Sequence, residues 1–198
     1  MLQEGGKMKK VGVLALQGGV EEHLQILSQI KGVEPISVKY LEDLNNIEGL
    51  IIPGGESTTL GKLLTIFNML EPLKEKINEG LPIWGTCAGM ILLAKQIEND
   101  TTKHLGVMDI TVRRNAYGRQ LGSFETKAVI EEVSQEPIPL VFIRAPYVSE
   151  ANENVEILLR VDGKIVACRE DNMLATAFHP ELTKDKRFHE YFVREFVN

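Results

Sequence analysis

The sequence has few of the features that mark secreted, membrane-bound or nucleic-acid-binding proteins. It contains only two cysteines in 198 residues, too few for a disulfide framework, and neither has the spacing of a metal-ligand set. No apolar stretch approaches the roughly 20 residues that span a bilayer. The net charge is −6, whereas a nucleic-acid-binding face needs an excess of lysine and arginine. We therefore expect a cytoplasmic protein with no metal, and with neither a membrane nor a nucleic acid as its partner.

The start of the chain also lacks a targeting signal. Residues 1–8, MLQEGGKM, have no apolar core of the kind that a signal peptide requires. We interpret them as a polar lead in front of one domain that covers residues 9–198. A chain of this length is expected to form one domain with a sizeable core.

Strand-like and helix-like segments alternate over the first half of the chain. Short apolar runs, typical of strands buried on both faces, are separated by segments with helical spacing. The predicted strands cover residues 11–16, 35–40, 49–52 and 81–84, and the predicted helices cover residues 20–30, 57–67, 70–78 and 88–95. This alternation predicts a single three-layer α/β domain with a mixed, mainly parallel sheet flanked by helices.

The second half of the chain has a different pattern. From residue 105 to residue 130 the segments are short and interrupted by glycines. Residues 155–160 and 164–169 are joined by Asp162-Gly163, a strong hairpin signal. We expect antiparallel strands here, laid on the same sheet, then a strand over residues 174–178 and a closing helix over residues 184–196.

One of the two cysteines lies at a sharp corner, in Gly85-Thr86-Cys87-Ala88-Gly89. The pattern Gly-x-Cys-x-Gly has the form of a nucleophile elbow, a strained turn whose neighbours must not carry clashing side chains. A sulfur at this position lies at a helix N-terminus, which favours the thiolate. The Ala88 N–H would then face the same space and stabilise an oxyanion. The competing interpretation is a buried structural cysteine, which we favour for the second cysteine, Cys168.

A base and an orienting group for Cys87 occur late in the chain. The predicted strand at residues 174–178 ends in His179-Pro180-Glu181. Residues two apart in an extended chain project to the same side, so Glu181 can orient the His179 imidazole toward the sulfur. The remaining histidines lack this context: His23 is predicted on a helix surface or in a groove, His104 in a polar loop and His189 on the closing helix.

The second unusual segment is IIPGGESTTLGKLL, in which a buried strand stops at Pro53 and a helix follows Gly54-Gly55. We expect Ser57 or Thr58 to cap this helix. The Gly55 N–H can supply a second oxyanion donor, although an ordinary strand-to-helix turn is the competing interpretation. The loop lacks the Gly-Lys-Ser/Thr ending of a P-loop, so nucleotide binding is not predicted.

Together these motifs resemble those of the triad-type, class I glutamine amidotransferases, whose fold is flavodoxin-like. Longer strings resemble, within that superfamily, the glutaminase subunits of the two-component pyridoxal 5′-phosphate synthases. These strings are LALQGGVEEH, PGGESTT, GTCAGMILLA, RRNAYGRQLGSFE, FIRAP and AFHPEL, and they span residues 14–182. Tyr117, where phenylalanine is expected, is a modest departure from the family pattern.

The resemblance implies a glutaminase that needs no cofactor and releases ammonia from L-glutamine. Carried over by position, Cys87 is the nucleophile, His179 the base and Glu181 the orienting group. The glutamine site that the resemblance implies is lined by Gly55, Glu56, Ser57, Arg114, Ile143 and Arg144, with Gly55 and Ala88 as oxyanion donors. An arginine suits the α-carboxylate of glutamine, but the sequence leaves open whether Arg113 or Arg114 turns inward.

The resemblance also implies a protein partner, a (β/α)₈ synthase subunit that joins ammonia, a pentose phosphate and a triose phosphate in a large hetero-oligomer. The isolated glutaminase is expected to be weak, and docking is expected to reorient Gly54-Gly55. Gln17, after the first strand, would lie at the edge that meets the partner. The alternatives are a glutaminase of another pathway, a cysteine peptidase-like relative and a non-catalytic module. The peptidase-like relatives often place histidine directly after the nucleophile, where this chain has Ala88.

Overall fold

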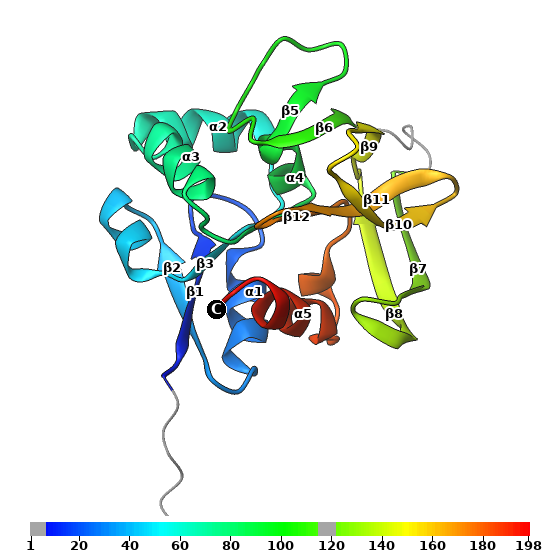
Figure 1. Cartoon of the computed structure of the whole chain (residues 1–198), viewed down its shortest axis with the longest axis horizontal. Coiled ribbons are helices and arrows are strands. Elements are labelled where there is room, and N and C mark those ends of the chain that lie inside the picture. The colour runs from blue at the N-terminus through cyan, green and yellow to red at the C-terminus, as the bar shows by residue number, and fades with distance from the viewer. Residues whose placement is uncertain (1–6, 115–121) are drawn as a thin grey trace, which may run out of the picture.

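The computed structural model describes residues 7–114 and 122–198, and these residues form a central mixed sheet flanked by helices (Figure 1). Within the described residues, this sheet has ten strands in the order β2-β1-β3-β4-β12-β11-β9-β6-β5, with β10 paired to β11. A separate two-stranded sheet joins β7 and β8. The predicted α/β class and the mixed, mainly parallel sheet are confirmed.

The strands are β1 (Lys9–Leu14), β2 (Val33–Val38), β3 (Gly49–Ile52), β4 (Ile83–Thr86), β5 (Ala94–Ile97), β6 (Met108–Arg113), β7 (Ser123–Ile130), β8 (Ser134–Ile143), β9 (Tyr147–Ala151), β10 (Glu156–Val161), β11 (Lys164–Glu170) and β12 (Met173–Thr176). The helices are α1 (Val20–Ser28), α2 (Ser57–Ile66), α3 (Leu70–Asn78), α4 (Ala88–Leu93) and α5 (Arg187–Glu195). Two 3₁₀ turns, η1 (Leu41–Asn46) and η2 (Pro180–Leu182), complete the described elements.

The parallel part of the sheet positions the candidate site. Strands β2, β1, β3, β4 and β12 run in one direction, so their carboxyl ends meet at one edge. Every residue of β3, β4 and β12 is buried, which explains why these strands are short continuous apolar runs rather than alternating ones. Ligands of open α/β sheets bind outside this carboxyl edge.

Helices cover both faces of the parallel strands. Helices α1 and α5 lie on one face, and α2, α3 and α4 lie on the other (Figure 1). Trp84 on β4 is fully buried, and its ring lies 5.2 Å from the Phe188 ring and 5.7 Å from the Phe192 ring of α5. The closing helix therefore uses the phenylalanine stripe seen in the sequence to cover the sheet.

The antiparallel part is confirmed with one difference. The predicted hairpin forms between β10 and β11, and its two turn residues, Asp162 and Gly163, have φ values of 49° and 76°, as a type I′ turn requires. However, in the described part of the chain β7 and β8 pair only with each other, apart from the main sheet. This ribbon accommodates the prolines at 137 and 139 of β8, which a central strand would exclude.

The boundaries of α4 differ from the prediction. The helix expected over residues 88–95 ends at Leu93, and Ala94 begins strand β5, which pairs with β6. All six residues of α4 are buried. A helix without a polar face gives no periodic signal at its end, so the apolar run hid the change from helix to strand.

Candidate active site

The Cys87 corner joins β4 to α4 at the carboxyl edge of the sheet. Cys87 has φ 49° and ψ −104°, a strained backbone for a residue with a side chain. A Cβ on Gly85 would lie 2.5 Å from the Gly89 carbonyl carbon and oxygen, and one on Gly89 would lie 2.3 Å from the Ile52 carbonyl oxygen. The Cys87 N–H also donates to the Thr176 carbonyl at 2.8 Å. The two glycines therefore allow the close packing that the elbow pattern predicts.

His179 follows β12, the strand next to β4. Its N–H donates to the Val141 carbonyl at 2.8 Å, and its Nδ1 lies 2.7 Å from Glu181 Oε1. The pair was expected to meet on an extended chain, but Pro180–Leu182 forms a 3₁₀ turn instead. This turn brings the carboxylate back beside the ring, so the predicted contact is present through a different backbone geometry.

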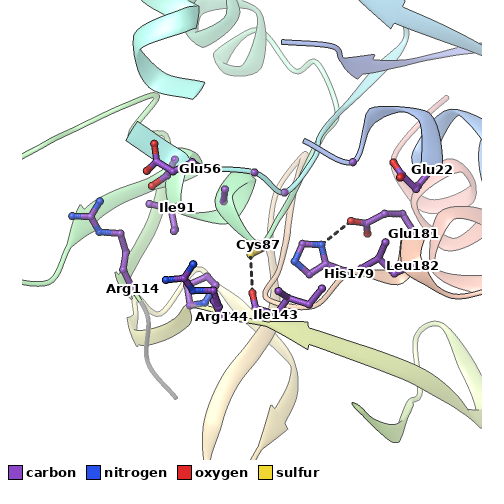
Figure 2. Close-up of a pocket in the computed structure, with 16 residues that line it drawn as sticks. Glu22, Glu56, Cys87, Ile91, Arg114, Ile143, Arg144, His179, Glu181 and Leu182 are labelled. Atoms are coloured by element: carbon purple, nitrogen blue, oxygen red, sulfur yellow. Dashed lines mark hydrogen bonds and ion pairs between the residues drawn. The ribbon is translucent and has the colours of Figure 1, made fainter. Parts of the chain in front are cut away.

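Cys87 and His179 face each other across the candidate site, with Glu181 behind the ring (Figure 2). A Cβ on Gly54 would lie 2.5 Å from His179 Cε1 and 3.4 Å from Cys87 Cβ, so Gly54 packs directly against both side chains. Since Glu181 occupies Nδ1, the ring nitrogen left for the sulfur is Nε2. Cys87, His179 and Glu181 are 8%, 9% and 5% exposed, and the chemistry that they allow is shielded from bulk water.

The electrostatics of the pair favour a charged imidazole. Burial lowers the pKa of His179, but hydrogen bonds to the Cys87 side chain and to Glu181, together with their charges, outweigh it and raise this pKa to about 10. An imidazolium beside the sulfur stabilises a thiolate, the reactive form of cysteine.

The loop after β3 is capped differently from the prediction. Neither Ser57 nor Thr58 caps α2; the Glu56 carboxylate accepts hydrogen bonds from the Thr58 N–H at 3.0 Å and the Thr59 N–H at 2.7 Å. The hydrogen bond from the Thr59 hydroxyl, together with these backbone bonds, lowers the pKa of Glu56 to about 2. An ionised carboxylate suits the positive end of the helix dipole, which explains why it replaces the shorter hydroxyl caps.

All the predicted site residues lie around one cavity of about 700 Å³. It is lined by Cys87, Ala88, His179, Glu181, Gly55, Glu56, Ser57, Arg114, Ile143 and Arg144. The structure settles which arginine turns inward: Arg114 lines the cavity and pairs with Asp100, whereas Arg113 bonds Tyr147 and Glu98. Arg144 is held at the rim with a positive φ of 46°, and its N–H donates to the Gly122 carbonyl.

The prediction for His23 was wrong. The residue was expected on a helix surface or in a groove, but it is fully buried and its Nε2 lies 3.5 Å from Glu181 Oε2. His23 precedes the buried Ile26 and Leu27 by three and four residues, so it lies on the inner face of α1. That spacing was a signal that could have found it. Cys168 is fully buried, as predicted.

Other cavity-lining residues were not assigned to the site. They are Gly19, Glu22, Gly54, Ile91, Pro146 and Leu182. Across residues 7–114 and 122–198, no group of three or more histidine, cysteine, aspartate or glutamate side chains is arranged to hold a metal ion. The absence of a cofactor from the reaction stays a prediction, and Tyr117 lies outside the described residues.

Comparisons with known proteins agree on one family. The chain matches the SNO glutamine amidotransferase family over residues 13–198. A protein of Ruminiclostridium cellulolyticum named pyridoxal 5′-phosphate synthase subunit PdxT is 65% identical over 93% of this chain and 98% of its own length. The PdxT protein of Clostridium botulinum is 59% identical over 96% of this chain and 98% of its own length.

Solved structures agree with this assignment. A crystal structure described as a glutamine amidotransferase is 44% identical, covers 93% of this chain and 97% of its own, and superposes with a TM-score of 0.87. The structure of PurLQS from Thermotoga maritima covers 95% of this chain and 98% of its own with a TM-score of 0.72. At 16% identity, the second likeness concerns the fold alone.

Proposed function

The chain belongs to the SNO glutamine amidotransferase family, and on this premise we propose that it is the glutaminase subunit of a pyridoxal 5′-phosphate synthase. It hydrolyses L-glutamine to L-glutamate and ammonia through Cys87, His179 and Glu181. The observation that carries the proposal is the convergence of these three side chains on one cavity, with 2.7 Å between His179 Nδ1 and Glu181 Oε1.

In the first half of the reaction, the Cys87 sulfur attacks the side-chain amide carbon of glutamine. The sulfur reacts as a thiolate whose proton is already on His179 Nε2, and Glu181 stabilises this imidazolium through Nδ1. The carbonyl oxygen becomes an oxyanion, and the N–H groups of Gly55 and Ala88 stabilise it. His179 then gives its proton to the leaving nitrogen, so ammonia departs and a glutamyl thioester remains.

In the second half of the reaction, water takes the place that ammonia leaves. His179, now neutral, removes a proton from the water as it attacks the thioester carbon. The same two amides stabilise the second oxyanion. Collapse of this intermediate breaks the carbon–sulfur bond, releases glutamate and returns the proton to the Cys87–His179 pair. Each proton that His179 accepts is thus returned in the next step.

Substrate binding is assigned to the wall of the cavity opposite the triad. Arg114 and Arg144 lie on this side (Figure 2), and a guanidinium can bind the α-carboxylate of glutamine through two parallel hydrogen bonds. Glu56 supplies negative charge for the α-ammonium group. Ser57 and Ile143 also line the cavity.

The ammonia is used by a second polypeptide. We assign a synthase subunit as the partner, because the relatives are named as subunits of a synthase, and the family resemblance implies that this subunit is a (β/α)₈ protein in a large hetero-oligomer. Among the described residues, no helix has the length and hydropathy needed to cross a bilayer. We assign the enzyme to the cytoplasm, which would keep both of its cysteines reduced.

The test is a glutaminase assay of the full chain, alone and with a pyridoxal 5′-phosphate synthase subunit from a close relative. The wild type should release ammonia from glutamine, faster with the partner present. Cys87→Ala should lower kcat by at least about 10⁴-fold and still bind the partner, because the side chain is small and Ala fits the same turn. Ammonia release by Cys87→Ala at the wild-type rate would contradict the proposal.

A further inference from the structure

Two buried histidines lie behind Glu181, on the side away from the cavity. His23 comes from α1 and His189 from α5, and both are fully buried. His23 Nδ1 lies 2.8 Å from His189 Nε2, and His23 Nε2 lies 3.5 Å from Glu181 Oε2. The row of polar groups that begins at Cys87 therefore continues through His179 and Glu181 to His23 and His189, under the helices α1 and α5.

We propose that His23 and His189 are positioning residues, which hold Glu181 and thereby the His179 imidazole in the geometry that proton transfer needs. This inference rests on the proposed glutaminase function. It gives Glu181 two separate contacts: Oε1 binds His179 at 2.7 Å, and Oε2 faces His23. Neither His23 nor His189 lines the cavity, so both act through Glu181 and not on glutamine.

The tautomers follow from the carboxylate. An ionised carboxylate only accepts hydrogen bonds, so the His23 nitrogen that faces it must be Nε2–H. His23 Nδ1 is then an acceptor, and His189 Nε2–H donates to it. His189 Nδ1, which has no hydrogen-bond partner in the described part of the chain, then carries a lone pair and no proton. The reverse arrangement would turn a lone pair toward Glu181 and bury an unpaired N–H.

The environment keeps both rings neutral. Burial, the largest cause, lowers the pKa of His23 and that of His189 to about 3 in each case. The Trp84 ring lies 5.8 Å from the His23 ring and 4.9 Å from the His189 ring, edge-on to both. A neutral pair can donate a hydrogen bond to the buried carboxylate without competing with the His179 imidazolium for its charge.

The need for this contact comes from the burial of Glu181. Its side chain is 1% exposed, and among the described residues neither Glu181 Oε2 nor the facing His23 Nε2 has a closer hydrogen-bond partner. A buried carboxylate oxygen without a donor is costly, and the 3.5 Å approach of His23 Nε2 is the contact that offsets this. A shift of Glu181 toward a better partner would pull on His179, so fixing Oε2 also fixes the ring.

The test compares His23→Leu with His23→Gln in the full chain assayed with the synthase subunit. His23→Leu removes the donor and should lower kcat about tenfold to a hundredfold, as second-layer partners of catalytic groups do, with KM changed less than about twofold. His23→Gln keeps an N–H for Glu181 and an oxygen for His189, and it should recover most of the kcat. His189→Phe, which leaves the His23 N–H in place, should cost less than His23→Leu.

A second readout reports the Cys87–His179 pair without glutamine. Iodoacetamide alkylates thiolates, and Cys168 should stay silent because it is buried and burial raises its pKa to about 12. His23→Leu should slow alkylation of Cys87 by a factor similar to the loss of kcat, and His23→Gln should restore it. Thermal unfolding of each variant confirms that a folded protein is compared.

Equal loss in folded His23→Leu and His23→Gln would overturn the inference, because it would indicate a packing role. Wild-type kcat in both would overturn it as well. If His23→Leu does not fold, the proposal is tested by comparing His23→Gln with His189→Phe. The proposal expects His23→Gln to keep most of the wild-type kcat, so a loss of kcat in His23→Gln with none in His189→Phe would contradict it. Glu181→Gln and Cys87→Ala, assayed in parallel, test the proposed function itself: activity in Cys87→Ala would end both proposals.

Discussion

Two neighbouring strands of the parallel sheet, β3 and β4, end in loops that differ in how much of their backbone is packed tightly. The loop after β4, the Cys87 corner, is fixed by direct contact between backbones at Gly85 and Gly89. The loop after β3, residues 53–56, is packed as tightly in its buried half, where a Cβ on Gly18 would overlap the Gly54 carbonyl oxygen, but its exposed half, Gly55 and Glu56, has no such backbone contact. The Glu56 N–H donates to Gln17 Oε1 at 2.9 Å, and the Gly19 N–H donates to the Gly54 carbonyl at 3.2 Å.

The difference indicates which half of the site can adjust. Close backbone packing has no alternative arrangement, because any shift creates an overlap or a void. A hydrogen bond at an exposed loop can be exchanged for one to water at a net cost of about 0.5–1.5 kcal/mol, and Gly55 and Glu56 are exposed. The nucleophile is therefore rigid, while the amide of Gly55 can be repositioned. If docking of a partner activates the enzyme, we expect the movement in the exposed residues Gly55 and Glu56.

The largest loss of stability and activity is expected from Gly89→Ala, which tests the rigidity of the Cys87 corner. The added Cβ would lie 2.3 Å from the Ile52 carbonyl oxygen, and backbone atoms on both sides cannot move apart cheaply. Overpacking of this kind costs about 1–3 kcal/mol, so the free energy of unfolding should fall by that amount. Displacement of Cys87 should also lower kcat by more than about tenfold. Denaturant unfolding and the glutaminase assay measure the two effects.

Gly55→Ala is the matched control for Gly89→Ala. Its Cβ would approach the tip of the Gln17 side chain at 3.0 Å, with the next atoms at 3.5 Å. A flexible side chain can move by this amount, and the free energy of unfolding should change by less than about 0.5 kcal/mol. An equal loss of stability in the two variants would show that the two loops are held alike.

Much of this contrast could be predicted from the sequence. The glycines around Cys87 follow a nucleophile-elbow pattern, and the sequential alternation of strand and helix fixes which strand ends share an edge. The convergence of Cys87 and His179 was predictable because both follow buried strands, and parallel strands end together. Their roles rest on the family resemblance rather than on the pattern alone.

Other features could not be predicted because they depend on contacts distant in the sequence. The Glu56 cap replaces two hydroxyl residues that local preference favours as caps, and the hydrogen bond from the Glu56 N–H to Gln17, which is distant in the sequence, holds Glu56 in place. The residues next to His23 do not show whether it faces solvent or Glu181. Only its spacing from Ile26 and Leu27 indicates that it lies on the inner face of α1. The α4–β5 boundary lies inside an apolar run and is set by pairing with β6.

A smaller loss of unfolding free energy than that of Gly89→Ala is expected from Glu56→Ala, in the loop after β3. Removal of an N-terminal cap costs about 0.5–2 kcal/mol, and this loss should depend on pH. The pKa of Glu56 falls from 4.5 in the unfolded chain to about 2 in the fold, so its contribution is present above pH 4.5 and is lost as the pH falls through 2. The difference in unfolding free energy between wild type and variant should therefore shrink between these pH values.

Glu56→Gln separates the charge from the hydrogen bonds. It keeps an acceptor for the Thr58 and Thr59 N–H groups but cannot titrate in this range. Its free energy of unfolding should lie between those of wild type and Glu56→Ala at pH 7, and its gap to Glu56→Ala should not vary with pH. A gap between wild type and Glu56→Ala that stays constant down to pH 2 would mean that the cap does not use an ionised carboxylate.

A loss of stability smaller than that of Glu56→Ala is expected from Gln17→Ala, which tests directly how the loop after β3 is held. It removes one of the two hydrogen bonds that hold residues 53–56, and the free energy of unfolding should fall by no more than about 1 kcal/mol. Because the loop carries the Gly55 amide, kcat should fall about threefold to tenfold, the equivalent of one hydrogen bond lost in the transition state. Gln25→Ala, at an exposed position of α1, is the control and should leave both quantities unchanged. If Gln17→Ala lowers stability as much as Gly89→Ala, the loop after β3 is as rigid as the Cys87 corner, and the adjustable half of the site must be sought elsewhere.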